Sequence, residues 1–305
     1  MRRPGVALVA VLVLLAALSG CGGDPAVPPS PPTGAAATAL RFASYDFGEN
    51  QSLVEVYAEA ARRAGVPVEV RHGVGTREIV WPAMEQGLVD VVIDYLGTAL
   101  AFARPSEDTT RRTPEEVRAA LDRTLFVRGI AVLAAAQAAD QNGFAVTRVL
   151  AGKHDLTALS DLAPLAGGLR FGGPPECPER PFCLLGLERV YGLHFEEVLS
   201  MPSRAATADA LRAGQIDVGM LETTNPRLAV SGLILLDDDR GLQPHENVVP
   251  LVRTDALPRW GERLRKAFDE VSARLTTEDL VQLNRAVEVE GLSPAEAAAR
   301  WWSAT

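Results

Sequence analysis

The stretch that decides the fold reads FGGPPECPERPFC over residues 171–183 and continues as LERVYGL over residues 187–193. A short apolar strand, predicted around Leu169 and Phe171, runs into two glycines and two prolines, which end any helix and stiffen the backbone. Two cysteines follow with prolines between them, and a helix is predicted from about Leu185. Ligands of α/β proteins usually lie beyond the carboxyl ends of the strands. The stretch is therefore a rigid strand-to-helix connection, either at a ligand site or on an ordinary surface loop.

Four other blocks share a family likeness with this stretch. They are DYLGTAL at residues 94–100, DQNG at 140–143, SDL at 160–162 and GLERVYGL at 186–193. Together with FGGPPE at 171–176 they resemble the substrate-binding lipoproteins of ABC importers for glycine betaine, choline, carnitine and proline. The resemblance extends from about residue 40 to residue 300. It implies an α/β fold of the two-lobed, type II periplasmic-binding-protein kind, with a ligand cleft between the lobes and two crossover strands. The residue pattern alone predicts only two α/β lobes.

The resemblance also implies domain boundaries and a role. The first lobe would comprise residues 40–138 plus 247–305, and the second lobe residues 139–246. Such a protein closes its lobes over a small osmolyte-type ammonium compound and passes it to the permease and ATPase subunits of the importer. It would be a monomer without a cofactor and not an enzyme. Two alternatives remain open: transport of another ligand, such as an amino acid or a polyamine-like cation, and a solute-sensing receptor.

The N-terminus has the pattern of an export signal. Residues 1–20 begin with Arg2 and Arg3 and continue as an apolar run from residue 6 to residue 18. That run is too short to span a bilayer as a permanent helix. Together with Cys21 it resembles a bacterial lipoprotein signal, which implies cleavage before Cys21, lipidation of its thiol and an extracytoplasmic protein anchored to the cell membrane. A plain secretory signal or an uncleaved anchor is the alternative. Residues 21–39, rich in Pro, Gly, Ala and Ser, are predicted to be a flexible linker.

The charge balance excludes one class of partner. The chain has 30 basic and 39 acidic residues, so loss of Arg2 and Arg3 leaves 28 − 39 = −11. A nucleic-acid-binding protein needs a basic face, which this balance does not favour. Acidity mildly favours a cationic ligand, although solubility alone is the default explanation.

The two remaining cysteines, Cys177 and Cys183, form an even pair. In the oxidising compartment implied by the export signal, such a pair is expected to form a disulfide. A catalytic thiol is the rival interpretation, but no histidine lies nearby in the sequence, and two cysteines without partners do not make a zinc site. The four histidines are scattered without ligand spacing, and no Gly-x-Ser-x-Gly motif occurs. A metal site and a hydrolase or transferase activity are therefore not supported.

Periodicity and capping signals predict the elements. The first lobe should begin with a strand at 40–45, a helix at 50–64, a strand at 66–70, a glycine-bearing turn at 72–76, a helix through 85 and a strand at 88–93. Capping boxes begin helices after Thr113 and Ser293, and another helix begins at Thr276. Residues 140–146 are expected to begin the second lobe, strands are expected at 234–236 and 247–252, and residues from 258 onward should be helical. Trp301 and Trp302 are expected to dock the last helix.

An internal echo supports two related lobes. Residues 83–91 (AMEQGLVDV) resemble residues 210–218 (ALRAGQIDV), and both are typical of a helix end, a glycine cap and an apolar strand that begins after Asp. Polar residues follow each strand, Asp94-Tyr95 in the first copy and Glu222-Thr223 in the second. Each lobe would thus present an acidic side chain at the carboxyl end of a strand, although helix-glycine-strand units are also common by chance.

The family motifs assign candidate ligand-binding residues. Relatives hold a quaternary ammonium group in a cage of tyrosines by cation–π attraction. Tyr95 and Thr98 match the Tyr-x-Gly-Thr block directly, and Asp140 and Asn142 match the Asp-Gln-Asn block. Asn50 stands where the family has glutamine.

Other cage positions depart from the family. Ala208 replaces a tyrosine, Glu222 replaces an aromatic residue, and Pro-His-Glu-Asn at 244–247 stands where relatives have Pro-x-Tyr-Tyr. Tyr57 and Tyr191 are expected to be structural, so a full aromatic cage is not expected. Either Glu222, Glu246 or Asp94 neutralises an ammonium ligand, or the ligand differs in kind; each acid could also be a solvated strand end. The candidate set is Tyr45, Asn50, Thr76, Asp94, Tyr95, Thr98, Asp140, Asn142, Glu222, Asn225, His245, Glu246 and Asn247.

Overall fold

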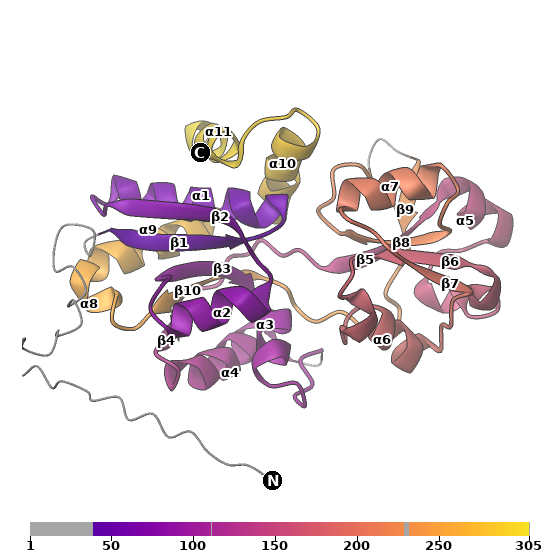
Figure 1. The fold of residues 1–305 in the computed structure, drawn as a ribbon, viewed down its shortest axis with the longest axis horizontal. Coiled ribbons are helices and arrows are strands. Elements are labelled where there is room, and N and C mark those ends of the chain that lie inside the picture. The colour runs from indigo at the N-terminus through magenta and orange to yellow at the C-terminus, as the bar shows by residue number, and fades with distance from the viewer. Residues whose placement is uncertain (1–38, 111, 229–231, 305) are drawn as a thin grey trace, which may run out of the picture. The chain divides into compact units, whose positions relative to one another are not determined.

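The computed structural model describes residues 39–110, 112–228 and 232–304, and contains two five-stranded sheets (Figure 1). The predicted signal peptide and Cys21 lie outside the described residues. Within the described part of the chain, no helix combines the length and the apolar character that a membrane span requires.

The first sheet has the strand order β2-β1-β3-β10-β4. Its parallel core consists of β1, which pairs with β2 and β3, while β10 runs antiparallel to β3 and β4. The strands are β1 (Leu40–Tyr45), β2 (Val68–Gly75), β3 (Val91–Tyr95), β4 (Ile130–Val132) and β10 (Val248–Arg253).

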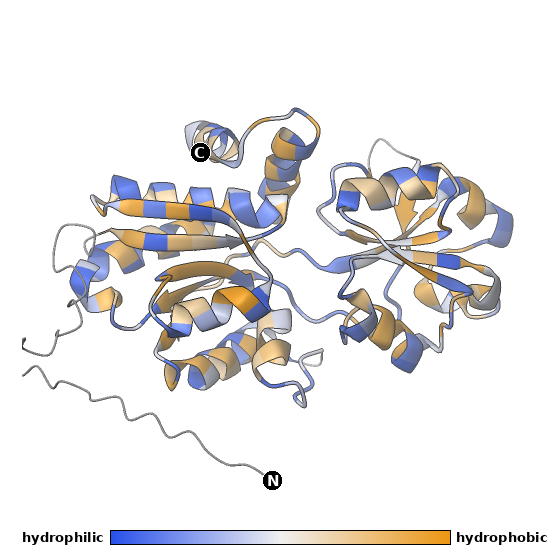
Figure 2. Cartoon of the chain, viewed as in Figure 1, coloured by the Kyte–Doolittle hydropathy of each residue, from blue (hydrophilic) through white to orange (hydrophobic). Residues whose placement is uncertain are grey.

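Alternation along these strands fills two cores, one on each face of the sheet. Phe42 of β1 and Ile93 of β3 belong to a cluster with α1 and the C-terminal helices. Their neighbours Ala43 and Val92 belong to a second cluster with α2, α3 and α4. Because both faces are covered, β3 begins with three buried apolar residues before Asp94 (Figure 2). The helices of this half are α1 (Gly48–Arg63), α2 (Arg77–Glu85), α3 (Leu96–Ala103), α4 (Pro114–Phe126), α8 (Leu257–Trp260), α9 (Glu262–Arg274), α10 (Thr277–Glu288) and α11 (Pro294–Ala304).

The second sheet has the order β7-β6-β8-β5-β9. Here β6 is parallel to β7 and β8, and β5 is antiparallel to β8 and β9. The strands are β5 (Asn142–Thr147), β6 (Arg170–Gly173), β7 (Glu197–Ser200), β8 (Val218–Glu222) and β9 (Leu233–Leu235). The helices are α5 (Arg148–His154), α6 (Leu184–Gly186) and α7 (Arg204–Arg212), with a π-helical turn at Leu187–Tyr191 after α6.

The two sheets belong to the α/β, two-lobed arrangement expected from the sequence. The chain leaves the first sheet after β4 and returns to it at β10. The two connecting segments lie side by side, because Ala139 bridges Asn247 and the amide of Asp140 donates to the carbonyl of Glu246 (3.1 Å).

The internal echo is visible as a repeated contact. Arg41 donates from its backbone nitrogen, Nε and Nη2 to Asp90, at 2.7–3.0 Å, and Arg170 makes the same three contacts with Asp217, at 2.9–3.2 Å. Gly87 and Gly214 both have positive φ at the helix ends, as a glycine cap requires. Both halves therefore contain the same helix-glycine-strand unit, and in each an equivalent Arg–Asp pair joins its strand to the neighbouring strand.

Most predicted elements are confirmed, with differences at β2 and β3. The first strand agrees to the residue, and the expected capping contacts of Thr113 with Glu116 and of Ser293 with Glu296 are formed. The helix expected at Thr276 also begins with a capping box. The predicted turn at 72–76 is wrong, because β2 continues to Gly75, where it pairs with Tyr45 of β1. The third strand begins at Val91 rather than Leu88, so that Asp94 and Tyr95 lie within it.

The C-terminal tryptophans dock the last helix as expected. Trp301 is buried, and Trp302 Nε1 donates to the carbonyl of Val56 in α1 (3.1 Å). The guanidinium of Arg63 lies 4.2 Å from the centre of a Trp302 ring.

Candidate functional site

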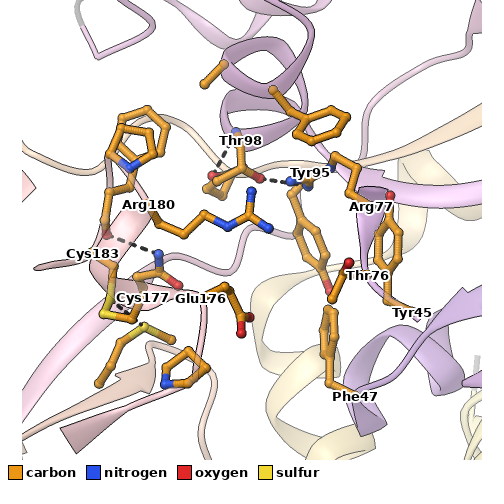
Figure 3. A pocket seen from close by; sticks show the side chains of 18 of the residues that line it. Tyr45, Phe47, Thr76, Arg77, Tyr95, Thr98, Glu176, Cys177, Arg180 and Cys183 are labelled. Carbon is orange, nitrogen blue, oxygen red and sulfur yellow. Dashed lines mark hydrogen bonds between the residues drawn. A yellow bond between two sulfur atoms is a disulfide. The ribbon is translucent and has the colours of Figure 1, made fainter. Parts of the chain in front are cut away.

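A cavity of about 450 Å³ lies at the carboxyl ends of the central strands (Figure 3). Its lining comes from both sheets: Tyr45 and Tyr95 end β1 and β3, while Met220 and Glu222 belong to β8. In an α/β protein, a ligand usually lies beyond the carboxyl ends of the strands.

Aromatic rings form one wall of this cavity. The ring of Phe47 stacks between Tyr45 and Tyr95, with centroids 6.2 Å from each, and all three line the cavity. Phe102 and Phe182 also contribute to the lining. The wall thus retains two of the predicted tyrosines and adds phenylalanines that the motifs had not indicated.

A buried carboxylate behind this wall fixes its geometry. Asp94 is completely buried and accepts hydrogen bonds from the hydroxyl of Tyr45 (2.5 Å), Nε1 of Trp81 (3.0 Å) and two nitrogens of Arg77 (2.6 and 3.2 Å). Burial alone would lower the pKa of Arg77, but the Asp94 carboxylate raises it above its ordinary value. Asp94 therefore supports Arg77 and Tyr45 and is not itself part of the lining.

Arg77 covers part of the aromatic wall. Its guanidinium carbon lies 5.6 Å from the ring centre of Tyr45 and 5.8 Å from that of Phe102. A cation within about 6 Å of a ring centre is in range for cation–π attraction. The Arg77 guanidinium therefore already occupies the cation position beside the rings of Tyr45 and Phe102.

Glu246 caps the start of α3. Its carboxylate accepts from the backbone nitrogens of Gly97 (3.1 Å) and Thr98 (2.9 Å), the open amides at the N-terminus of a helix. Burial nevertheless raises the pKa of Glu246 to about 8, outweighing these hydrogen bonds. Glu246 lines the cavity and ties the returning chain segment to α3.

The second sheet contributes an ion pair and a buried acid. Arg204, the first residue of α7, pairs with Glu222 at the end of β8. Asp140 accepts from the hydroxyl of Thr223 and the amide of Thr224, both at 3.1 Å. Burial, together with the neighbouring Glu49 and Glu222, raises the pKa of Asp140 well above its ordinary value.

The double-proline stretch lies against the cavity. Cys177 and Cys183 are joined as a disulfide with a Cα–Cα distance of 5.2 Å, and most residues from 174 to 183 belong to the lining. Arg180 projects into the cavity in Figure 3 and donates to Glu78 of α2 (2.7 Å). The disulfide loop thus carries charged side chains to the site.

The structure brings eight of the predicted residues to the cavity wall. They are Tyr45, Thr76, Tyr95, Thr98, Asp140, Asn142, Glu222 and Glu246. The other predicted residues are outside the lining and have structural contacts. Asn50 joins β1 to β3 through the amide of Tyr45 and the carbonyl of Ile93, and Asn247 donates to the carbonyl of Ala136. Asn225 accepts from the amide of Arg227, and His245 is exposed while its carbonyl accepts from Gly97.

The sequence reasoning missed the three arginines of the lining, Arg77, Arg180 and Arg204. The internal echo was the available signal for two of them, because Arg77 and Arg204 are the first residues of the equivalent helices α2 and α7. The described residues contain no group of three or more His, Cys, Asp or Glu placed to hold a metal ion.

Comparison with known proteins identifies the family. Residues 38–304 match the family OpuAC, described as the substrate-binding domain of the ABC-type glycine betaine transport system. The glycine betaine-binding protein YehZ of Escherichia coli K12 is 25% identical over 274 residues, covering 87% of this chain and 90% of its own length. A glycine-betaine-binding protein of Pseudomonas aeruginosa is 27% identical over 277 residues, 87% of each chain.

A solved structure supports the fold. The crystal structure of a glycine betaine/carnitine/choline ABC transporter protein aligns with a TM-score of 0.71 at 21% identity, covering 87% of this chain and 98% of that one. At that identity the likeness supports the fold alone, whereas the family match spans all the described residues. The chain belongs to the family of substrate-binding domains of ABC-type glycine betaine transport systems, and is thus an extracytoplasmic solute-binding protein of an ABC importer and not an enzyme.

Proposed function

We propose that the cavity captures a small substituted-ammonium compound, with glycine betaine as the first candidate and choline and carnitine as close alternatives. The observation that carries this proposal is the combination of an aromatic wall with an excess of carboxyl groups in one cavity. An ammonium group is attracted both to the face of an aromatic ring and to a nearby carboxylate.

The charges of the lining favour a cationic group. Six carboxyl side chains and three arginines line the cavity. Each arginine already has an acidic partner: Arg77 pairs with Asp94, Arg180 with Glu78 and Arg204 with Glu222. Only the last of these partners belongs to the lining, so five lining carboxyl groups have no arginine partner among the described residues: those of Asp46, Asp140, Glu176, Glu179 and Glu246. Burial raises the pKa of Asp140 and Glu246, which favours the neutral forms of these two.

These pairings change the roles expected from the sequence. Asp94, Glu222 and Glu246 were the acids expected to neutralise the ligand, but each is engaged by Arg77, by Arg204 or by the amides of α3. Asp140 has only hydroxyl and amide donors, and Glu176 is exposed at the cavity edge. We therefore assign the ammonium-facing charge to Glu176, because burial raises the pKa of Asp140 and favours its neutral form.

The arginines provide a place for the other end of a zwitterion. A guanidinium has five N–H donors, so one carboxylate partner does not exhaust it. Arg180 lies in the disulfide loop and Arg204 begins α7, so both enter the lining from the part of the chain that contains the second sheet, whereas the aromatic wall comes from the part with the first. This arrangement fits a compound with an ammonium group at one end and a carboxylate at the other. A cavity of about 450 Å³ is within the ordinary size of small-molecule sites.

A second candidate is a ligand of different chemistry in the same transport role. The replacement of family aromatic residues by Ala208 and Glu222 weakens the cage on the second-sheet side and adds an ion pair there. That change favours a primary amine, as in an amino acid or a polyamine-like cation, since a primary amine donates hydrogen bonds to carboxylates and a quaternary one does not.

The remaining features of the proposal concern the whole protein. We infer a lobe boundary at residues 40–138 plus 247–305 against 139–246, supported by the two separate sheets and the paired connecting segments. We also infer an anchor through lipidated Cys21, a monomer in solution, and delivery of the ligand to permease and ATPase subunits. Mass spectrometry of the membrane-bound protein would test the anchor, since an unmodified Cys21 would contradict it.

Isothermal calorimetry on the purified protein tests the ligand class. The panel contains glycine betaine, choline, carnitine, proline, basic amino acids and a polyamine. Saturable binding of one of the first three would support the substituted-ammonium proposal. Heat from a basic amino acid or polyamine alone would refute it and support the second candidate.

A further inference from the structure

A buried glutamate lies directly behind the aromatic wall. Glu49, the second residue of α1, is 5% exposed and does not belong to the cavity lining. Its Oε1 accepts the hydroxyl of Tyr95 at 2.7 Å. The Glu49 carboxylate therefore fixes the hydroxyl group of Tyr95, a residue that lines the cavity.

The other oxygen of Glu49 connects this ring to two further elements. Oε2 accepts from the hydroxyl of Thr224 (2.7 Å), which follows β8 of the second sheet, and from Nδ2 of Asn284 (2.6 Å) in α10. Asn284 Nδ2 also lies 3.1 Å from the Thr224 hydroxyl. Thr224 is completely buried and Asn284 is 4% exposed, so water does not compete for these contacts.

The network joins four elements that are far apart in the sequence. It includes the end of β3, the start of α1, the segment after β8 and the middle of α10. The amide of the same Thr224 donates to Asp140 of the lining (3.1 Å). One carboxylate thus fixes Tyr95 on one side and, through Thr224, the second-sheet side of the cavity on the other.

We propose that Glu49 is a positioning residue for ligand capture: it orients Tyr95 and joins it to Thr224 and Asn284, so that affinity for the ammonium ligand depends on a carboxylate that the ligand does not touch. This inference rests on the proposed function and deepens it. A hydrogen bond to a charged acceptor is stronger than one to a neutral acceptor and restricts the donor more closely. An ionised Glu49 also adds electron density to the phenol through its hydrogen bond, which strengthens the attraction of the ring for a cation.

Protonation of the network should weaken capture. The acids that interact with Glu49 electrostatically are Asp140, Glu222 and Glu288, and Arg204 and Arg227 act in turn on Glu288. Burial raises the pKa of Glu49, although Thr224, Asn284 and Tyr95 oppose that effect. Asp140 has its pKa raised by burial and by Glu49. Each proton taken up on acidification removes negative charge near the ammonium group.

The test measures choline affinity of the purified protein by calorimetry across pH, because a quaternary ammonium group has no titratable proton and the profile reports the protein alone. Glu49→Gln keeps the size of the side chain and removes its charge. We expect it to weaken choline binding about tenfold at neutral pH, the scale of one hydrogen bond to a charged group. The affinity of the parent protein should fall on acidification, and the variant should show a flatter profile.

Two further variants keep the test decisive. Glu55→Gln is the matched control, since Glu55 is also a buried glutamate of α1 but contacts His72 and Arg62 away from the cavity. Thr224→Val removes only the hydroxyl donor and should weaken binding even if Glu49→Gln fails to fold. Parent-like affinity and an unchanged pH profile in Glu49→Gln, or parent-like affinity in Thr224→Val, would overturn the inference. Absence of choline, betaine and carnitine binding by the parent protein would instead overturn the proposed function, and with it this inference.

Discussion

Replacement of Asp94 by asparagine should destabilise the whole first half of the protein. Asp94 is completely buried and accepts five hydrogen bonds, from Tyr45, Trp81, the amide of Tyr95 and twice from Arg77. Asparagine removes the charge and one acceptor oxygen, and leaves the Arg77 guanidinium without its partner. Breaking a buried ion pair in this way costs about 3 to 5 kcal/mol, or a decrease of roughly 10 °C in Tm for a chain of this size.

The assay is thermal unfolding by circular dichroism, with two comparison proteins. Asp217→Asn is the matched control, because Asp217 pairs with Arg170 and the two side chains are 25% and 35% exposed, so water can replace the lost contact. The double variant Asp94→Asn with Arg77→Met removes both charges and should recover part of the lost Tm.

Two results would refute the reasoning. One is a Tm for Asp94→Asn within about 2 °C of the parent protein, which would mean that the pair does not carry the expected energy. The other is a double variant that is less stable than Asp94→Asn alone, because an unpaired Arg77 would then not be the cause of the loss.

Three other changes have defined outcomes. Serine at both Cys177 and Cys183 should cost about 2 kcal/mol by loop entropy and lower Tm by a few degrees, and an equal Tm after verified oxidation of the parent protein would contradict this. Burial raises the pKa of Glu246 from 4.5 to about 8, so the folded protein retains this proton between those values, and the resulting stability is lost as pH rises through about 8. Glu246→Gln should therefore flatten the dependence of Tm on pH across that window. Parallel curves for the parent protein and the variant would count against this prediction. Arg204→Gln leaves Glu222 without its cation and should strengthen choline binding in calorimetry, whereas weaker binding in a folded variant would exclude Glu222 as an attractive charge.

The parts of the fold that local signals encode were predictable. The first strand alternates along residues 40–45, and the capping box after Thr113 begins α4 as expected. The end of β2 was not predictable in the same way. His72 to Gly75 have glycines and no alternation, and their strand conformation depends on pairing with β1, where Gly75 lies beside Tyr45. A turn signal was therefore overridden by a partner distant in sequence.

In the site, too, the residue types could be predicted from the sequence, but the contacts between them could not. Motifs indicated Tyr95, Thr98 and Asp140, which line the cavity. They did not reveal that Glu222 is paired with Arg204, since a sequence shows charges but not which of them meet. The acids singled out from the sequence thus occupy strand ends as expected, while the charge available to a ligand depends on neighbours from other elements.

The same reasoning applies to the network behind Tyr95. Asn50 was singled out from a family motif, but the structure places it between β1 and β3, and the adjacent Glu49 contacts Tyr95. Its other partners, Thr224 and Asn284, are separated from it by most of the chain. No local pattern predicts such a contact, because it depends on packing of α10 against α1.

The central claim, that a positive charge is held by rings and carboxylates in this cavity, is tested most directly by an isosteric pair of ligands. Calorimetry would compare glycine betaine and choline with their tert-butyl analogues, in which a carbon atom replaces the charged nitrogen at nearly the same size. The account predicts saturable binding of at least one charged compound and a large loss of affinity for its neutral-headed analogue. Equal affinity for the two members of each pair would show that shape and apolar contact alone select the ligand, and would contradict the account.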